Sequence, residues 1–185
     1  QLVGLYDETN QSKKALAVLE VAYKQGLLDD TTEYTALAQR LIQAGYPHKA
    51  TRILHQGFDN FIVWVTPENL TLLASAYIQA QEPQHAIPIL DKALSTATNS
   101  RPGQLLSQLY LNQQNWEKSI DTLLLTLELA NEKEAINLQL SLGYAYYEQG
   151  QIKEATTLFS LLAENTQLNN QTKQTVKDWN NYLQN

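Results

Sequence analysis

One stretch of the chain decides its fold: residues 142–159, which read LGYAYYEQGQIKEATTLF. Leu142, Gly143 and Tyr146 stand at i, i+1 and i+4, the spacing of residues on one face of a helix. Gly150 follows where a helix C-terminus favours a left-handed residue. The stretch therefore predicts two helices joined by a short polar turn.

The same pattern recurs along the chain. After the turn, Ala155 is followed four residues later by Phe159, and this small–large pair has four earlier counterparts: Ala15 with Leu19, Ala50 with Leu54, Ala86 with Leu90 and Ser119 with Leu123. Nine residues before each small member stands Tyr6, Leu41, Tyr77, Tyr110 or Tyr146, and thirteen before stands Leu2, Leu37, Leu73, Leu106 or Leu142. Five copies of one template indicate a repeat protein.

We therefore predict an all-α chain, a right-handed superhelical solenoid of about five helix pairs plus a C-terminal capping helix. The expected segments are 1–30 (truncated at its N-terminal side), 31–66 (with a long connection), 67–99, 100–134, 135–168 and the cap 169–185. The first unit begins part-way through its template and the chain has no Met. Both features favour a piece of a longer protein.

Local signals mark where the helices begin. Asp30-Thr31-Thr32-Glu33 is typical of a capping box, and Thr66-Pro67 and Arg101-Pro102 place proline in a first helical turn. Pro88 lies within the second helix of the third unit, so we expect that helix to start late or to bend.

Two segments lie outside the template. Residues 171–183 place Val176, Trp179 and Leu183 on one helical face, which predicts a cap with Trp179 as its anchor rather than a ligand contact. The connection 57–65 contains Phe61 and Trp64 and is too apolar for a solvated linker. We favour an interpretation in which it folds back over the groove between units two and three; the alternative is an exposed partner-binding patch.

Composition excludes several classes of function. The 185 residues carry a net charge of −6, which argues against nucleic-acid binding because phosphate contacts require a basic surface. There is no Cys, so thiol catalysis, disulfides and zinc-thiolate sites are excluded. No apolar run is long enough to span a membrane.

We find no constellation typical of an enzyme and expect no catalytic residue, cofactor or metal site. His48 and His55 are seven residues apart on one predicted helix, about 10 Å, which is too far to share a metal. With His85 they are interpreted as surface histidines. No phosphate-binding loop or nucleophile elbow is present.

The predicted partner-binding surface is the concave face lined by the first helix of each pair. Its expected residues are Thr35, Gln39, Gln43, Thr71, Ser75, Gln79, Arg101, Gln104, Gln108, Asn112, Tyr144, Tyr147 and Glu148. This face is mostly polar, uncharged and rich in Gln. A merely solvated face remains the alternative.

The template resembles the tetratricopeptide repeat over essentially the whole chain, with residues 142–159 the nearest match. The closing proline typical of that repeat is absent from every unit. Chaperone-type members of the family bind a C-terminal carboxylate through Lys, Arg and Asn. The corresponding positions here hold Thr35, Gln39, Leu72, Arg101 and Leu105. Only Arg101 fits, so a carboxylate clamp is disfavoured and capture of an extended peptide or a helix stays open.

Shorter phrases carry a narrower resemblance. Residues 23–28 (YKQGLL), 44–50 (AGYPHKA), 53–57 (ILHQG), 73–77 (LASAY) and 179–183 (WNNYL) are similar, in this order, to the C-terminal part of repeat proteins associated with TonB systems in marine gammaproteobacteria. The resemblance implies a periplasmic scaffold that assists TonB-dependent energy transduction in iron uptake, with TonB, ExbB or ExbD-type partners. The alternative is an adaptor or assembly module of another complex, in the cytoplasm or the envelope.

Overall fold

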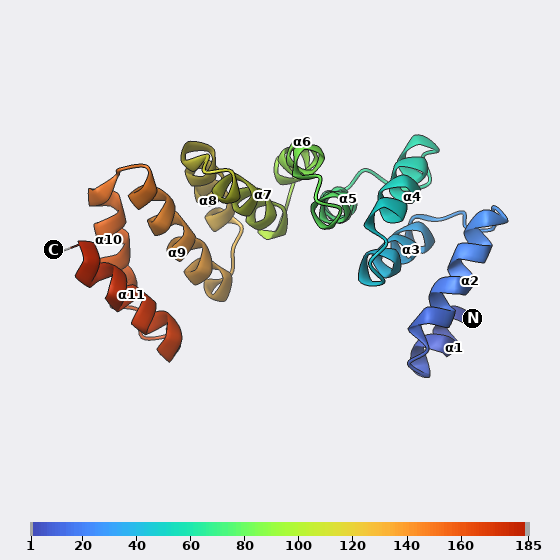
Figure 1. Ribbon diagram of the computed structural model, residues 1–185, viewed down its shortest axis with the longest axis horizontal. Helices are drawn as coiled ribbons and strands as arrows, with labels where there is room; N and C mark the ends of the chain where they lie inside the picture. The colour runs from blue at the N-terminus through green and yellow to red at the C-terminus, as the bar shows by residue number, and fades with distance from the viewer. Residues whose placement is uncertain (1, 184–185) are drawn as a thin grey trace. The chain divides into compact units, whose positions relative to one another are not determined.

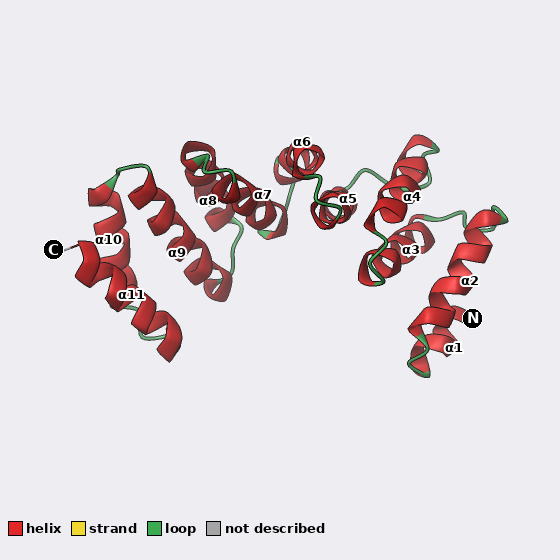
Figure 2. Cartoon of the chain, in the orientation of Figure 1, coloured by secondary structure: helices red, strands yellow, loops and turns green. Residues whose placement is uncertain are grey.

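The computed structural model describes residues 2–183, and within this range it is built from helices without strands, as expected (Figures 1 and 2). The helices are α1 (Leu2–Glu8), α2 (Ser12–Lys24), α3 (Thr31–Gln43), α4 (Pro47–Asp59), α5 (Pro67–Gln79), α6 (Pro83–Leu94), α7 (Arg101–Asn112), α8 (Trp116–Glu128), α9 (Glu132–Glu148), α10 (Ile152–Ala163) and α11 (Asn170–Leu183). No helix in the described part of the chain combines the length and apolar character needed to cross a membrane.

The chain forms two compact units, Gln1–Ser95 with α1 to α6 and Thr96–Asn185 with α7 to α11. Within each unit, every helix packs against the helix that precedes it and the helix that follows it (Figure 1). In the first unit α3 also contacts α5. This serial packing is the arrangement expected for stacked helix pairs. The limits of the individual repeats stay predictions.

The repeated template forms the core. All five small–large pairs are buried: Ala15 with Leu19, Ala50 with Leu54, Ala86 with Leu90, Ser119 with Leu123, and Ala155 with Phe159. The template leucines Leu37, Leu73, Leu106 and Leu142 are buried as well, whereas the side chain of Leu2 lies outside the described residues. The regular spacing in sequence therefore corresponds to a regular set of contacts between helices.

Gly143 shows how closely these helices approach. A methyl group at this position would lie 2.7 Å from Cζ and 2.8 Å from Cε2 of Phe159, shorter than van der Waals contact. Phe159 is itself completely buried. The absence of a side chain on α9 is thus what allows the phenyl ring of α10 to fit.

The turns within the helix pairs share one geometry. Gly45 and Gly150 have φ of +80° and +82°, as predicted. The backbone amide of Tyr46 donates to the carbonyl of Leu41 (2.8 Å), five residues earlier, which is the 6→1 hydrogen bond of a Schellman motif. The corresponding turns of the first, third and fourth pairs use non-glycine residues at positive φ: Asn10, Gln81 and Gln114.

The predicted capping box at the start of α3 is wrong in one arm. The Asp30 carboxylate accepts from the amide of Glu33 (2.8 Å), but the Glu33 carboxylate accepts from the amide of Asp29 (3.2 Å) rather than that of Asp30. A complete capping box occurs instead at α9, between Asn131 and Glu134.

The proline predictions are mostly confirmed. Thr66 caps α5, with Pro67 in the first turn, and Pro102 lies in the first turn of α7. The late start expected from Pro88 is wrong, because α6 begins at Pro83 and continues through Pro88 to Leu94.

Gly143→Ala tests the close approach of the helices. Although alanine favours a helix over glycine by roughly 0.5–1 kcal/mol, displacing a buried phenyl ring costs typically 1–3 kcal/mol, so we expect net destabilisation. Gly4→Ala in α1 is the matched control, because no atom lies within 4 Å of the added methyl group. Urea unfolding followed by circular dichroism measures both; a Gly143→Ala variant at least as stable as Gly4→Ala contradicts the expectation.

Candidate functional site

Most residues predicted for the concave face are accessible. In the first unit Gln39, Gln43 and Gln79 are exposed, and in the second Arg101, Gln108, Asn112, Tyr144 and Glu148 are exposed; Thr35, Ser75, Gln104 and Tyr147 are partly buried. Thr71 is an exception. Its side chain is 8% exposed and its hydroxyl donates to the carbonyl of Pro67 (2.6 Å), so it presents no group to a partner.

The small hydroxyl residues of this face bond to their own helices. Thr35 donates to the carbonyl of Thr31 (2.9 Å), and Ser75 donates to the carbonyl of Thr71 (2.7 Å). In the second unit the side-chain amide of Gln108 donates to the side-chain oxygen of Asn112 (3.0 Å). Much of the hydrogen-bonding capacity expected for a partner is therefore used within the protein.

The distinctive feature of the second unit is a group of five rings, which we call the aromatic cluster: Trp116, Tyr144, Tyr147, Trp179 and Tyr182. The rings of Trp116 and Tyr144 are 5.8 Å apart between centroids and nearly perpendicular. Tyr144 and Trp179 follow at 6.2 Å, and Tyr147 and Tyr182 at 5.6 Å. Helices α8, α9 and α11 thus supply one continuous aromatic surface, on which Tyr144 is 38% and Tyr182 60% exposed.

Trp179 connects this surface to the core. Its ring stacks on Phe159 with centroids 5.1 Å apart and an interplanar angle of 5°. Val176, on the same helix as Trp179, is buried in the hydrophobic core that contains Phe159. Trp179 therefore anchors α11, as expected, while its ring also meets Tyr147 at 5.3 Å. Tyr182 is a site residue that the sequence pattern does not predict, although it lies three residues beyond Trp179 on the same helix.

A hollow of about 440 Å³ lies beside the aromatic cluster. We call it the α9–α11 hollow; it is lined by Tyr147, Thr175, Asp178, Trp179 and Tyr182. One carboxylate and three aromatic rings thus face the same space.

Two tyrosines of α9, Tyr144 and Tyr147, have raised pKa values. The hydroxyls of Tyr147 and Tyr182 are 2.8 Å apart, and this hydrogen bond is the main reason that the pKa of Tyr147 is raised, followed by burial and by the charges of Tyr182 and Glu148. The pKa of Tyr144 is raised mainly by burial and further by Glu148. Glu148 therefore gives this end of α9 a negative potential.

The connection 57–65 splits into two sides. Val63 is buried in the core of the first unit, and the hydroxyl of Thr31 donates to the carbonyl of Ile62 (2.6 Å). Phe61 and Trp64 are instead 90% and 72% exposed, so the expectation that the segment folds back over a groove fails for these two side chains. We call Phe61, Trp64 and the exposed Val65 the connection patch. Its role in binding stays a prediction.

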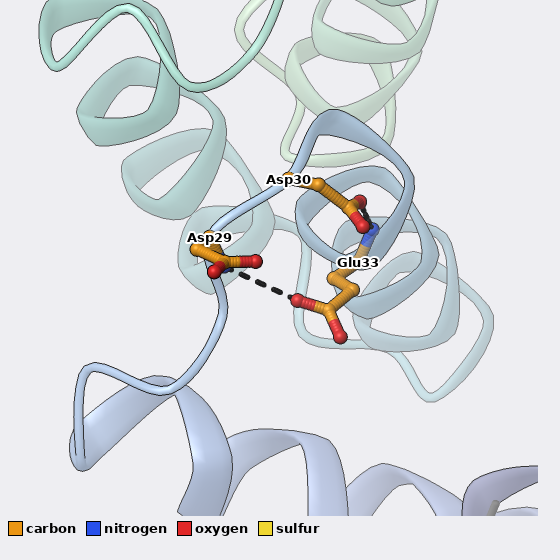
Figure 3. A group of neighbouring side chains, drawn as sticks. All are labelled: Asp29, Asp30 and Glu33. Atoms are coloured by element: carbon orange, nitrogen blue, oxygen red, sulfur yellow. Dashed lines mark hydrogen bonds between the residues drawn. The ribbon is translucent and has the colours of Figure 1, made fainter.

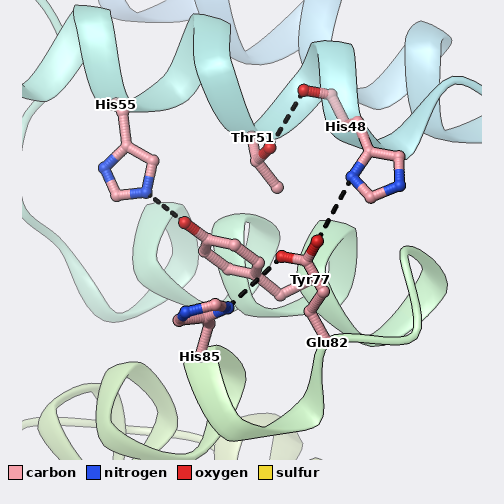
Figure 4. Close-up of polar contacts among 6 residues, drawn as sticks. All are labelled: His48, Thr51, His55, Tyr77, Glu82 and His85. Carbon is pink, nitrogen blue, oxygen red and sulfur yellow. Dashed lines mark hydrogen bonds and ion pairs between the residues drawn. The ribbon is translucent and has the colours of Figure 1, made fainter.

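The three histidines are exposed, as expected, but they converge (Figure 4). His48 from α4 and His85 from α6 place Nδ1 at 3.5 Å and 3.3 Å from the two oxygens of Glu82, and His55 Nε2 is 2.6 Å from the hydroxyl of Tyr77. They line a hollow of about 670 Å³. Spacing along one helix could not reveal this, because the partners lie on different helices.

Among residues 2–183, one group of acidic side chains has oxygens near enough to hold a metal ion: Asp29, Asp30 and Glu33, within 4.8 Å of one another (Figure 3). The carboxylates of Asp30 and Glu33 already accept backbone amides at the start of α3. Their arrangement is therefore accounted for by helix capping.

Tyr182→Phe tests the hydroxyl contact in the aromatic cluster. Because the contact favours the protonated form of Tyr147, its loss lowers the pKa of Tyr147 toward the ordinary value. In the parent protein, the stabilisation linked to this group is present below pH 10 and is lost as the pH rises through the raised pKa. NMR titration of ring-labelled tyrosine measures the change; an unchanged Tyr147 midpoint contradicts it, and Tyr6→Phe is the control.

Comparison with known proteins agrees with this architecture. Residues 70–102 match the tetratricopeptide repeat family. No curated protein matches the sequence. A crystal structure of MamA is similar with a TM-score of 0.75 and 17% identity, covering 96% of this chain and 95% of that one. A MamA structure from Desulfovibrio magneticus has a TM-score of 0.72, 16% identity and coverage of 88% and 90%.

A third similar structure is YrrB, described as a tetratricopeptide repeat protein with an unusual peptide-binding site. Its TM-score is 0.73 at 12% identity, with 95% of this chain and 88% of that one covered. The family match and these structures support a chain that has the tetratricopeptide repeat fold.

Proposed function

We propose that the protein is a non-catalytic scaffold that binds a segment of another protein on the aromatic cluster. The observation that carries this proposal is the continuous surface of five rings from α8, α9 and α11, whose Tyr144 and Tyr182 remain exposed. Aromatic residues are enriched among the side chains that dominate protein interfaces, because they supply a large contact area and a polar tip.

The position of the cluster favours binding as well. Its rings stand on helices rather than loops, and Trp179 is fixed by its stack on buried Phe159. A rigid surface loses little conformational entropy when a partner docks. YrrB, which shares the fold, is described as having a peptide-binding site, an analogy that raises the expectation of peptide binding here.

We further propose that the protein acts in the periplasm as an accessory of a TonB-dependent iron-uptake system, with TonB, ExbB or ExbD-type partners. The support is the ordered set of sequence phrases that resembles repeat proteins of such systems, including residues 44–50 and 179–183. The alternative is an adaptor of another complex in the cytoplasm or the envelope. The connection patch, with Phe61 and Trp64, is a second candidate contact surface in either setting.

The test measures binding of the purified protein to the periplasmic parts of TonB, ExbB and ExbD by surface plasmon resonance. We expect one of them to bind, and Tyr144→Ala to weaken it at least about 5-fold, the loss typical of a central aromatic contact. Tyr46→Ala is the matched control, since Tyr46 is an exposed tyrosine of the first unit.

The outcomes separate the parts of the proposal. If none of the three proteins binds, the TonB assignment is rejected; if Tyr144→Ala binds as well as Tyr46→Ala, the aromatic cluster is rejected as the binding surface. Trp64→Ala assigns any remaining binding to the connection patch. Fractionation of cells that carry the natural gene places the protein in the periplasm or contradicts that location.

A further inference from the structure

We propose that the α9–α11 hollow binds a lysine or arginine side chain of the partner segment. This inference rests on the proposed function and specifies the chemistry that the aromatic cluster recognises. It follows from the geometry of three rings, from the carboxylates beside them, and from the placement of the protein's own cations.

Three aromatic rings line the hollow, those of Tyr147, Trp179 and Tyr182. Their centroids are 5.3, 5.6 and 6.0 Å apart, and the ring planes are inclined by 60°, 73° and 89° to one another. A cation held over the midpoint of three centroids so spaced lies within about 6 Å of each, the range in which cation–π attraction acts. One position beside the three rings is therefore within that distance of all of them.

The charges beside the rings are negative. Asp178 lines the hollow, and one of its carboxylate oxygens accepts a hydrogen bond from the side-chain amide of Gln174 (2.7 Å). The charge of Glu148 at the end of α9 also acts on Tyr147 and contributes to the raised pKa of that group. A neutral segment that covered Asp178 would remove water from a carboxylate without replacing its interactions, whereas a cation would compensate the charge.

The lysines of α11 point elsewhere. At 100° per residue, Thr175, Asp178 and Tyr182 share one flank of the helix, whereas Lys173 and Lys177 lie about half a turn away. The negative and aromatic flank of α11 is therefore not neutralised by basic residues of its own helix.

The protein already uses the same contact between its own residues. Lys14, Lys49 and Lys118 lie over the rings of Tyr6, Tyr46 and Tyr110 at 5.7, 5.1 and 5.5 Å. These three pairs, the ones found among residues 2–183, all lie away from the α9–α11 hollow. Within residues 2–183, these contacts use none of the rings that line the hollow.

The occupant is a residue of a protein chain rather than a free small cation. Beside the hollow, Trp179 contacts the ring of Tyr144, which in turn contacts Trp116, so the aromatic surface extends beyond the space that one cation fills. The residues that flank a bound lysine or arginine find apolar contact there. Charge at the hollow and apolar area beside it together match an extended basic segment.

The experiment uses four capped heptapeptides that are identical except for a central arginine, lysine, glutamine or leucine. Binding to the whole protein at low salt is followed by NMR through the indole N–H of Trp179, distinguished from Trp64 and Trp116 by their phenylalanine variants. We expect saturable shifts with the arginine and lysine peptides, and binding at least about 5-fold weaker for the glutamine and leucine peptides.

Variants then assign the site. Asp178→Asn and Tyr182→Ala are expected to weaken the arginine peptide by about 3- to 10-fold each. Asp59→Asn removes the same charge from an exposed position in the first unit and is the matched control, with binding unchanged. Thermal unfolding of each variant verifies that α11 stays docked.

The inference is overturned if the leucine or glutamine peptide binds as tightly as the arginine peptide, if no peptide binds, or if Asp178→Asn behaves like Asp59→Asn. The proposed function has a separate readout. Capture of a TonB-system protein that depends on Tyr144 but not on Asp178 retains the scaffold and rejects the cation, whereas peptide selectivity without any such capture supports the cation site and rejects those partners.

Discussion

The structure depends on one steric relation, the contact between a small residue on one helix and a large apolar residue on the next. Gly143 and Phe159 are an example, because a side chain at Gly143 would not fit between the α9 backbone and the phenyl ring. The template pairs, such as Ala155 with Phe159, lie four residues apart on the second helix of each helix pair and are all buried, so each helix pair places a small and a large residue in its core. Burial of one phenylalanine contributes about 1.5–3 kcal/mol, a substantial share of the stability of a small domain.

The aromatic cluster forms where α11 packs on the fifth template unit. Phe159 occupies the large position of that unit, and the ring of Trp179 stacks on it. Trp179 also contacts Tyr147, so this one residue both covers the core and lines the α9–α11 hollow. Substitution of Trp179 would therefore affect stability and binding together, whereas Tyr182 and Asp178 report on the surface alone.

The sequence predicts features that repeat and misses those that do not. The template positions predict the helices and their buried faces because each position recurs at nearly constant spacing. The contacts of His48 and His85 with Glu82 could not be predicted in this way, because they bring together side chains from two helices and are not part of the repeated template. Gln81 and Gln114 could not be predicted for another reason: their left-handed turns are imposed by the helix ends, and glutamine carries no local signal for them.

The candidate site likewise contains residues that the repeat pattern predicts and residues that it does not predict. Tyr144 and Tyr147 follow from their register on a template helix, whereas Tyr182 joins them only through the docking of α11. Thr71 shows the opposite error, because a correct register does not reveal that its hydroxyl bonds to the carbonyl of Pro67.

Phe61 combines an unfavourable backbone conformation with an exposed apolar side chain. It has φ of +57° at the end of α4, a conformation that costs an L-residue roughly 1–2 kcal/mol and is best served by glycine or asparagine. The other non-glycine residues with positive φ among residues 2–183 are Asn10, Gln81 and Gln114, all polar. Neither the turn nor the core requires a phenyl ring there, and the ring is almost completely exposed. The fold therefore accounts for Val63 in this connection but not for Phe61 or Trp64, and the contact of these two exposed side chains with a partner stays a prediction.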